Sequence, residues 1–545
     1  MKKNYLIYIF IIFCAFSCLE DITMPEERQN TDRPILNVEK NPHAITYTSA
    51  TLSANIESAN GYKISARGFI YGLDSSLEGY TDSISISLGD NYGIGNFEFE
   101  LKNLTPDTKY YYVAFATNDK GTQYSEIKEF STWSETPTIE TGDPIDIFAG
   151  NATIPGIITF IGAASIEECG ICYSLTSENP VYGEDNTVAY QNSEYQFEIT
   201  LNKLAGSQTY YIRSYAKNSY GIAYGQTKIL QTPAIWEKAP NFDGAGRINY
   251  TTFTMSDNFY IAAGESGNSY SFNDMWEFNV AENCWKVKAN FPRIPRKALS
   301  SFVIGTRAYI GLGISNEAPN LSDIYTYHQY NNSWGAEISF PGQARAYACS
   351  FSIANDSSGY IIGGRITEGE REYRTLSDAW KYDGNSSSWK SIADFPVPIH
   401  EGISFISGNK AFVGLGACVT PGADVYYNSI WKYDQVNDLW ERVTTVPDAF
   451  NYRNGGITGV TVIENDAYII DGNNHIWALN LNSYIWTKKS EMPLPVEFKS
   501  LADNQCMFSY KNGSRNEYEI FTGLNHLSQL FYKYRPEWDN PVNTP

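Results

Sequence analysis

Short stretches that alternate apolar and polar residues recur along the chain and are separated by Gly, Pro, Asn, Asp and Ser. Residues 378–383 and 429–434 are two such stretches, and residues 359–364 and 411–416 are apolar runs that end in glycine. A period of two residues places alternate side chains on opposite faces of a strand, and the intervening residues favour turns. The pattern therefore predicts an all-β protein.

An internal duplication spans residues 34 to 232. Residues 116–121 (Ala-Thr-Asn-Asp-Lys-Gly) match residues 216–221 (Ala-Lys-Asn-Ser-Tyr-Gly) at an offset of 100 residues (216 minus 116). Residues 50–52 likewise match residues 152–154 within two residues of that offset. Several short alternating strands in about 100 residues are typical of a β-sandwich. Two consecutive sandwich domains are predicted.

The segment Leu104-Thr105-Pro106-Asp107-Thr108-Lys109-Tyr110 resembles the corner motif of fibronectin type III domains, in which a leucine, a proline and a tyrosine precede a late strand. In the second copy Leu204 and Tyr210 match, but Gly206 replaces the proline. The resemblance implies fibronectin type III-like sandwiches that act as spacers.

A second repeat, with a period near 50 residues, occupies the rest of the chain. Tryptophan recurs with gaps of 46 to 55 residues at positions 236, 285, 334, 389, 440, 486 and 538. A glycine that ends an apolar strand recurs at 264, 313, 364, 416, 472 and 523. This order resembles Kelch repeats, each of which forms one four-stranded blade, and implies a six-bladed β-propeller over residues 236–538. Either Trp236 or Trp538 is expected to close the ring, and the repeated Trp and Tyr side chains are expected to fill the space between blades.

The beginning of the chain has the layout of an export signal. Lys2 and Lys3 precede an apolar run at residues 5–13, which is too short to span a bilayer. The run ends in Ala-Phe-Ser-Cys at Cys18, which resembles the lipobox of bacterial lipoproteins. Acidic residues follow at once, and in the Bacteroidetes-type lipoproteins that this start resembles they accompany display on the outer face of the outer membrane. Cys18 is thus the predicted lipidation site.

Together these patterns predict five segments, in chain order. They are a signal peptide at 1–17, a tether at 18–33, fibronectin type III-like domains at 34–133 and 134–233, and a Kelch-type propeller at 234–540.

Charge excludes one class of partner. The formal net charge is -21, and loss of Lys2 and Lys3 with the signal peptide makes it -23. Such a chain repels phosphate backbones, so no nucleic-acid binding is expected.

Cys169 and Cys172 form the one CxxC pair. It lies in an alternating run, where positions i and i+3 face opposite sides, and no second ligand pair accompanies it. Buried free thiols are therefore expected, and no metal site or cofactor is predicted.

A basic residue recurs just before the first strand of each blade. The positions are Arg247, Arg296, Arg345, His400, Arg453 and Lys499. The geometry of Kelch propellers places them around one mouth of the channel, where bidentate arginine contacts suit an anionic ligand such as an acidic sugar. The alternative is that these arginines pair with neighbouring carboxylates and tie loops together. The segments 365–375 and 417–427 are expected to be loops on the same face, and Tyr373, Tyr426 and Tyr427 are candidates to stack on sugar rings.

Two kinds of enzyme are alternatives to a binding protein. Galactose oxidases also carry Kelch-like propellers, but the chain has five histidines, with His400 alone at the expected mouth, too few for a paired-imidazole copper site. A bacterial sialic-acid mutarotase family also uses a six-bladed Kelch-type propeller, and its chemistry needs a positioned acid and base. His400 and Glu401 could supply them, although adjacent residues of a strand point apart.

The predicted function is therefore non-catalytic binding of a glycan, acidic glycans included, or of an envelope protein at the propeller mouth. The predicted site residues are Arg247, Arg296, Arg345, His400, Arg453, Lys499 and Tyr373. A sugar mutarotase or epimerase and a structural or adhesion component of the outer envelope are the alternatives.

Overall fold

The structure is a computed structural model. It describes residues 32–38, 41–77, 83–85, 93–191, 194–369, 372–452, 459–495, 505–525 and 528–540. Within these ranges the only helices are two short 3-10 turns, η1 (Ala354–Asp356) and η3 (Pro536–Trp538). None of the helices in the described ranges is long and apolar enough to cross a membrane. The predicted all-β class is confirmed, and Cys18, Arg453 and Lys499 lie outside the described residues.

The first domain is a sandwich of two antiparallel sheets. One sheet has the order β1-β2-β5, and the other has the order β4-β3-β6-β7 with β8 on β6. The strand bounds are β1 (Ile35–Asn37), β2 (Ala50–Ser58), β3 (Ala66–Gly72), β4 (Ser83–Ser85), β5 (Gly95–Leu101), β6 (Lys109–Asn118), β7 (Gly121–Tyr124) and β8 (Lys128–Ser131). Alternate residues of the facing strands, such as Leu52, Phe69 and Tyr112, form the core between the sheets.

The second domain repeats this topology. Its sheets have the orders β10-β11-β14, with β9 on β11, and β13-β12-β15-β16, with β17 on β15. The bounds are β9 (Thr138–Thr141), β10 (Ile145–Phe148), β11 (Asn151–Phe160), β12 (Glu168–Ser174), β13 (Asn186–Ala189), β14 (Gln196–Leu201), β15 (Thr209–Asn218), β16 (Gly221–Tyr224) and β17 (Lys228–Gln231). Cys169 and Cys172 lie in β12, where both thiols are buried and neither is in a disulfide, as predicted.

The tyrosine corner is present in both sandwiches. The Tyr110 hydroxyl accepts a hydrogen bond from the N–H of Thr105 at 2.9 Å, and the Tyr210 hydroxyl accepts one from the N–H of Ala205 at 3.0 Å. The N–H of Gly206 donates to the carbonyl of Trp538 at 2.9 Å. Proline has no N–H to donate, so this bond explains why the second copy departs from the motif.

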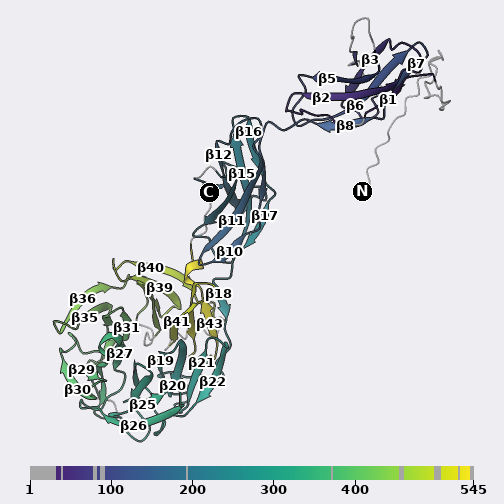
Figure 1. Cartoon of the computed structure of the whole chain (residues 1–545). Helices are drawn as coiled ribbons and strands as arrows, with labels where there is room; N and C mark the ends of the chain where they lie inside the picture. Colours follow the sequence, from purple (N-terminus) through teal and green to yellow (C-terminus); the bar gives the residue numbers. More distant parts are fainter. Residues whose placement is uncertain are drawn as a thin grey trace, which may run out of the picture. The chain divides into compact units, whose positions relative to one another are not determined.

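Six four-stranded antiparallel sheets, the blades, form the β-propeller (Figure 1). Blades 1 to 3 comprise β19 (Thr251–Met255), β20 (Asn258–Ala262), β21 (Met275–Asn279) and β22 (Cys284–Lys288); β23 (Ser300–Ile304), β24 (Arg307–Gly311), β25 (Asp323–His328) and β26 (Ser333–Ser339); and β27 (Cys349–Ile353), β28 (Ser358–Thr367), β29 (Tyr373–Asp383) and β30 (Ser388–Ile392).

Blades 4 to 6 comprise β31 (Ile403–Ser407), β32 (Lys410–Gly414), β35 (Ser429–Asp434) and β36 (Leu439–Thr445); β37 (Val460–Ile463), β38 (Asp466–Ile470), β39 (His475–Asn480) and β40 (Trp486–Glu491); and β41 (Cys506–Asn512), β42 (Glu517–Gly523), β43 (Phe531–Tyr534) and β18 (Trp236–Lys238). A small hairpin, β33 (Ala417–Cys418) and β34 (Val425–Tyr426), is inserted in blade 4.

The first strand of the propeller sequence closes the ring. In β18, Trp236 pairs with Tyr534 of β43, so the outer strand of blade 6 comes from the opposite end of the domain. Trp538 lies in η3 and is not part of a strand. The sequence left the choice between these two tryptophans open, and the structure selects Trp236.

Aromatic clusters join each blade to the next. Between blades 1 and 2, Tyr260 packs with Tyr327, and between blades 6 and 1, Phe508 stacks on Phe259 with ring centroids 4.4 Å apart. Each remaining neighbouring pair of blades shares its own buried apolar cluster. Burial of large rings between sheets is the main stabilisation that a propeller gains on closing. The repeated aromatics are core, as predicted.

Candidate functional site

Three of the predicted mouth arginines are internal to the blades. The side chains of Arg247, Arg296 and Arg345 are 0%, 1% and 0% exposed. Each forms a bidentate pair with an aspartate at the third strand of its own blade, with N···O distances of 2.5 to 3.0 Å, and the partners are Asp274, Asp323 and Asp378. Each also donates to two backbone carbonyls.

The surroundings fix these guanidinium groups further. Phe242, Phe291 and Phe340 lie under the three groups, with 4.8 to 5.0 Å between guanidinium carbon and ring centroid. Burial by itself raises the pKa of Asp274 and Asp378, but the hydrogen bonds and charge of the arginines outweigh it, so both carboxyl pKa values are lowered. The geometry matches the alternative in which these arginines hold the blades together, and their donors are already used.

His400 does not occupy the arginine position, and the prediction that it continues the basic series is wrong. The N–H of Ile399 donates to the carbonyl of Leu376, as the N–H of Arg345 donates to that of Leu321, and Ile399 therefore takes the arginine's place in blade 4. Ser429 takes the place of the aspartate, because its carbonyl accepts from Leu415 as that of Asp323 accepts from Leu312. Blade 4 has thus replaced both members of the ion pair.

His400 lies one position further along and is buried at the mouth. Its backbone pairs with that of Ala417, and neither ring nitrogen has a hydrogen-bond partner among the described residues. Burial first, and then the charge of Arg365, lower the pKa of His400 to about 4, so the imidazole is neutral at pH 7. The positive backbone φ of 53° at Glu401 breaks the strand alternation, and the Glu401 carboxylate lies 3.9 Å from Nδ1 of His400. The expectation that these two side chains point apart is wrong.

A chain of backbone hydrogen bonds runs around the mouth. Ala298 donates to Asn249, Tyr347 donates to Ala298, and Glu401 donates to Tyr347, each from N–H to carbonyl. All four residues have φ between 53° and 57°, which is the left-handed region. One residue from each of blades 1 to 4 therefore borders the channel.

The guanidinium of Arg365 is held between two tyrosine rings at this border. Its carbon lies 4.6 Å from the centroid of Tyr347 and 4.5 Å from that of Tyr373. Nε of Arg365 is buried without a hydrogen-bond partner, and no carboxylate within the described ranges lies at ion-pair distance from the group. Burial, and then the charge of Glu401, raise the pKa of Tyr347, which places that hydroxyl near both a cation and a carboxylate. Arg365 therefore differs from the three internal arginines in having a free hydrogen-bonding edge.

Each of the two segments expected to be loops contains paired strand residues near both ends and a turn between them. In blade 3, β28 extends to Thr367 and β29 begins at Tyr373, so Arg365 is paired with Thr375 in a long hairpin. In blade 4, residues 417–427 contain the hairpin β33–β34, and the N–H of Val419 donates to Oγ1 of Thr375 at 3.0 Å. Tyr373 and Tyr426 are 40% and 38% exposed, so both rings are accessible. The length of segment 365–375 singled it out in the sequence, but no sequence feature indicated the role of Arg365.

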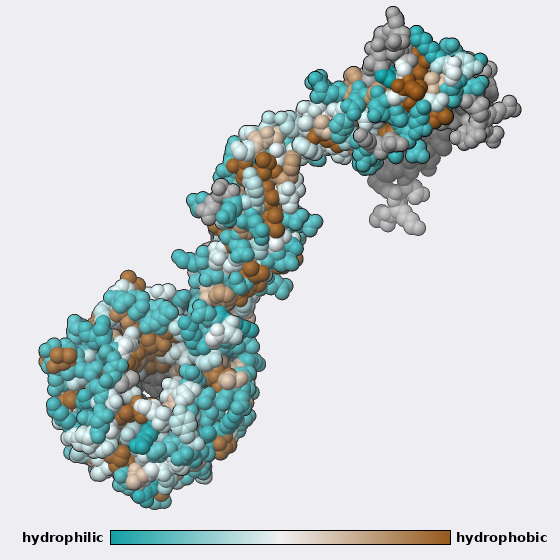
Figure 2. All heavy atoms as spheres, viewed as in Figure 1, coloured by the Kyte–Doolittle hydropathy of each residue, from teal (hydrophilic) through white to brown (hydrophobic). Residues whose placement is uncertain are grey.

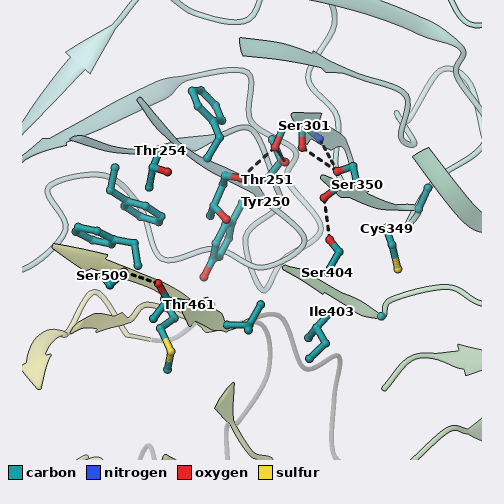
Figure 3. Close-up of a pocket in the computed structure, with 18 residues that line it drawn as sticks. Tyr250, Thr251, Thr254, Ser301, Cys349, Ser350, Ile403, Ser404, Thr461 and Ser509 are labelled. Atoms are coloured by element: carbon teal, nitrogen blue, oxygen red, sulfur yellow. Dashed lines mark hydrogen bonds between the residues drawn. The ribbon is translucent and has the colours of Figure 1, made fainter. Parts of the chain in front are cut away.

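Directly below the mouth is a polar cavity of about 330 Å³ along the propeller axis (Figure 3). Residues that follow the mouth residues in sequence, Ala348 and Gly402, line it. Hydroxyl groups from the inner strands gather around it, as Figure 3 shows for Thr251, Ser301, Ser350, Ser404, Thr461 and Ser509. The propeller face visible in Figure 2 is hollowed at its centre, and both hydrophilic and hydrophobic residues border the hollow.

No cluster of three or more His, Cys, Asp or Glu side chains suited to a metal ion occurs among the described residues. No protein-family model matches the chain, and no curated protein matches it. Among solved structures, the chain is similar to the structure of YjhT, with 15% sequence identity and a TM-score of 0.40 over 52% of this chain and 91% of that one.

Proposed function

We propose that the propeller binds, without catalysis, a glycan that carries a carboxylate, and that the site lies at the channel mouth around Arg365. The observation that carries the proposal is the Arg365 guanidinium, which is fixed between Tyr347 and Tyr373 and has no carboxylate partner among the described residues. A guanidinium that stacks on rings keeps its edge free for two parallel hydrogen bonds to a carboxylate.

The surroundings favour a sugar over a simple anion. Tyr373 offers an accessible ring for a sugar face, and the hydroxyl of Tyr347 offers a hydrogen-bonding group for a sugar hydroxyl. The chain carries a net charge of -21, so the attraction for an anion has to come from this local group rather than from the protein as a whole.

The test is a screen of the full chain against immobilised glycans, with each uronic-acid glycan beside its neutral counterpart, at two salt concentrations. Arg365→Ala is expected to abolish retention of the acidic glycans, and higher salt to weaken it. Arg374→Ala is the matched control, because Arg374 lies in the same hairpin, is 46% exposed and already pairs with Glu368. Equal binding of acidic and neutral glycans, or unchanged binding by Arg365→Ala, would refute the carboxylate site.

A sugar mutarotase or epimerase is the second candidate. It is favoured by one observation, the 3.9 Å approach of the Glu401 carboxylate to Nδ1 of His400 at the same mouth. Exchange between the anomers of a bound acidic sugar, followed by NMR line shapes, would establish catalysis if Glu401→Gln removes it and leaves binding intact. Binding without accelerated exchange would leave the propeller a binding protein.

We further propose that the chain is anchored through Cys18 in the outer membrane, with the two sandwiches as spacers between membrane and propeller. The sequence around Cys18 supports the anchor, and two or more acyl chains hold a protein firmly to a bilayer. Incorporation of labelled palmitate into the wild-type chain and its loss in Cys18→Ala would support the proposal, and protease accessibility of the propeller on intact cells tests display. A stable co-purifying envelope protein, with no glycan retention, would instead favour the structural or adhesion role.

A further inference from the structure

The hydroxyl groups of the axial cavity form a directed network. Oγ of Ser301 donates to the carbonyl of Thr252 at 3.0 Å, Oγ of Ser350 to that of Ser301 at 2.8 Å, and Oγ of Ser404 to that of Ser350 at 2.7 Å. Each bond joins the inner strand of one blade to that of the preceding blade. Each of these serine hydroxyls therefore donates its single hydrogen to a backbone carbonyl of the cavity wall.

Three further hydroxyl groups of the lining, those of Thr251, Thr461 and Ser509, also take part in this network. Thr251 lies 2.6 Å from Oγ of Ser301 and is the donor in that pair, because the Ser301 hydrogen is already used. Thr461 donates to Oγ of Ser509 at 2.9 Å, and Ser509 donates to the carbonyl of Val462 at 3.2 Å. These six hydroxyl groups, which Figure 3 shows around the cavity, thus donate into its wall, whereas the lining hydroxyls of Thr252 and Thr254 have no hydrogen-bond partner among the described residues.

The groups that this lining leaves free are mainly oxygen lone pairs, together with the hydroxyls of Thr252 and Thr254. Ser404 and Thr461 accept no hydrogen bond from the residues that the structure describes. A carboxylate placed here would find only neutral side-chain donors, such as the hydroxyls of Thr252 and Thr254, no cationic side chain in the described lining, and several acceptors, so the loss of its hydration would be unfavourable. A polyhydroxylated chain would donate a hydrogen to each acceptor, and about 330 Å³ has room for on the order of ten water molecules or a short polyol in their place.

We infer that the axial cavity is a subsite for an uncharged polyhydroxy chain, and that a ligand enters with this chain first while its carboxylate stays at Arg365 on the rim. The inference rests on the proposed function, since it orients the ligand of that same site. It names the ligand class as a polyhydroxy acid rather than a carboxylate alone. The two parts of the ligand are separated because the cavity wall offers uncharged groups, mainly acceptors, whereas the rim offers the cation Arg365.

The test uses three small probes of the same length in titration calorimetry with the full chain. D-Gluconate has a carboxylate and a polyhydroxy chain, hexanoate has the carboxylate alone, and sorbitol has the hydroxyls alone. Gluconate is expected to bind more tightly than either other probe. The variant Ser404→Ala, Thr461→Val is expected to weaken gluconate binding about tenfold and to leave hexanoate unchanged, because it removes two acceptors with little change of volume.

The controls separate the two claims. Ser388→Ala, Thr445→Val makes the same chemical changes on outer strands, at exposed positions, and is expected to bind gluconate like the wild type. Melting temperatures show whether each variant is folded, and either single substitution replaces the pair if the double variant is not. Equal affinities for gluconate and hexanoate, with no effect of the cavity variant, would overturn the inference while Arg365→Ala still tests the carboxylate site. Sorbitol binding without gluconate or hexanoate binding would support the cavity and overturn the carboxylate site, and no binding of any probe would overturn both.

Discussion

The guanidinium of Arg345 and the carboxylate of Asp378 are joined by two hydrogen bonds of 2.5 and 2.8 Å inside blade 3. The arginine is fully buried, whereas the aspartate side chain is 33% exposed. The same pair recurs in blades 1 and 2, where it joins the start of the first strand to the third strand of the blade. Blade 4 has Ile399 and Ser429 instead, which provides a natural comparison within one molecule.

Arg345→Ala is expected to destabilise the propeller by about 3 to 5 kcal/mol, because it leaves a carboxylate partly buried without its partner and empties a packed site over Phe340. The double variant Arg345→Ile, Asp378→Ser, which copies blade 4, is expected to recover part of that loss. Denaturant unfolding followed by tryptophan fluorescence measures both. If the double variant had the same free energy of unfolding as Arg345→Ala, the unpaired Asp378 carboxylate would not be the cause of the lost stability.

Acid is expected to destabilise the propeller through His400. Its pKa is lowered to about 4 in the folded chain, against 6.5 for an ordinary histidine. The unfolded chain therefore binds more protons between these values, so stability is fully present above pH 6.5 and is lost as pH falls through 4, by at most about 3 kcal/mol. His400→Gln is expected to flatten this part of the curve of melting temperature against pH, and an unchanged curve would contradict the prediction.

Glu537 is expected to give the stability of the propeller a pH dependence of the opposite sign, with stability lost as pH rises. Burial raises its pKa to about 7 from 4.5, and the charges of Glu517 and Glu464 add to the effect. The folded chain binds the extra proton, so stability present below pH 4.5 is lost as pH rises through 7. Glu537→Gln is expected to melt at a higher temperature than the wild type at about pH 8 and at a similar one at about pH 5, with the amide oxygen keeping the bond from the N–H of Tyr518. A melting temperature equal to that of the wild type at both values would contradict it.

Gly313 is expected to tolerate no side chain. Its φ is +96°, and a Cβ would lie 2.5 Å from the carbonyl oxygen of Lys297. Gly313→Ala should therefore cost about 3 kcal/mol through the strained φ and displacement of the backbone at Lys297. Gly305→Ala is the control, because Gly305 also has a positive φ, +60°, but open space at the Cβ position, and it should cost only about 1 kcal/mol. Equal losses, measured by denaturant unfolding, would show that the contact with Lys297 is not decisive.

The repeat patterns determined the architecture, because each repeat is a local signal. Alternation, turn residues and the spacing of Trp and Gly are read within one blade or one sandwich, and every blade has to bury the same faces. For this reason the sequence alone predicted two sandwiches and six blades and placed the tryptophans in the core. It could not choose between Trp236 and Trp538, since closure depends on a pairing between β18 and β43, which lie at opposite ends of the propeller sequence.

The candidate site was decided by tertiary structure. The series Arg247, Arg296 and Arg345 was visible in the sequence, but whether a guanidinium faces a ligand or an aspartate depends on contacts with a strand further along the chain, and the contacts show the aspartate. The long hairpin of blade 3 lengthens the repeat there, so spacing could not reveal that His400 lies one position beyond the series. Arg365 became a candidate only when the fold placed two tyrosines against it and no acid of the described residues at ion-pair distance, because the availability of a charge depends on its neighbours in space.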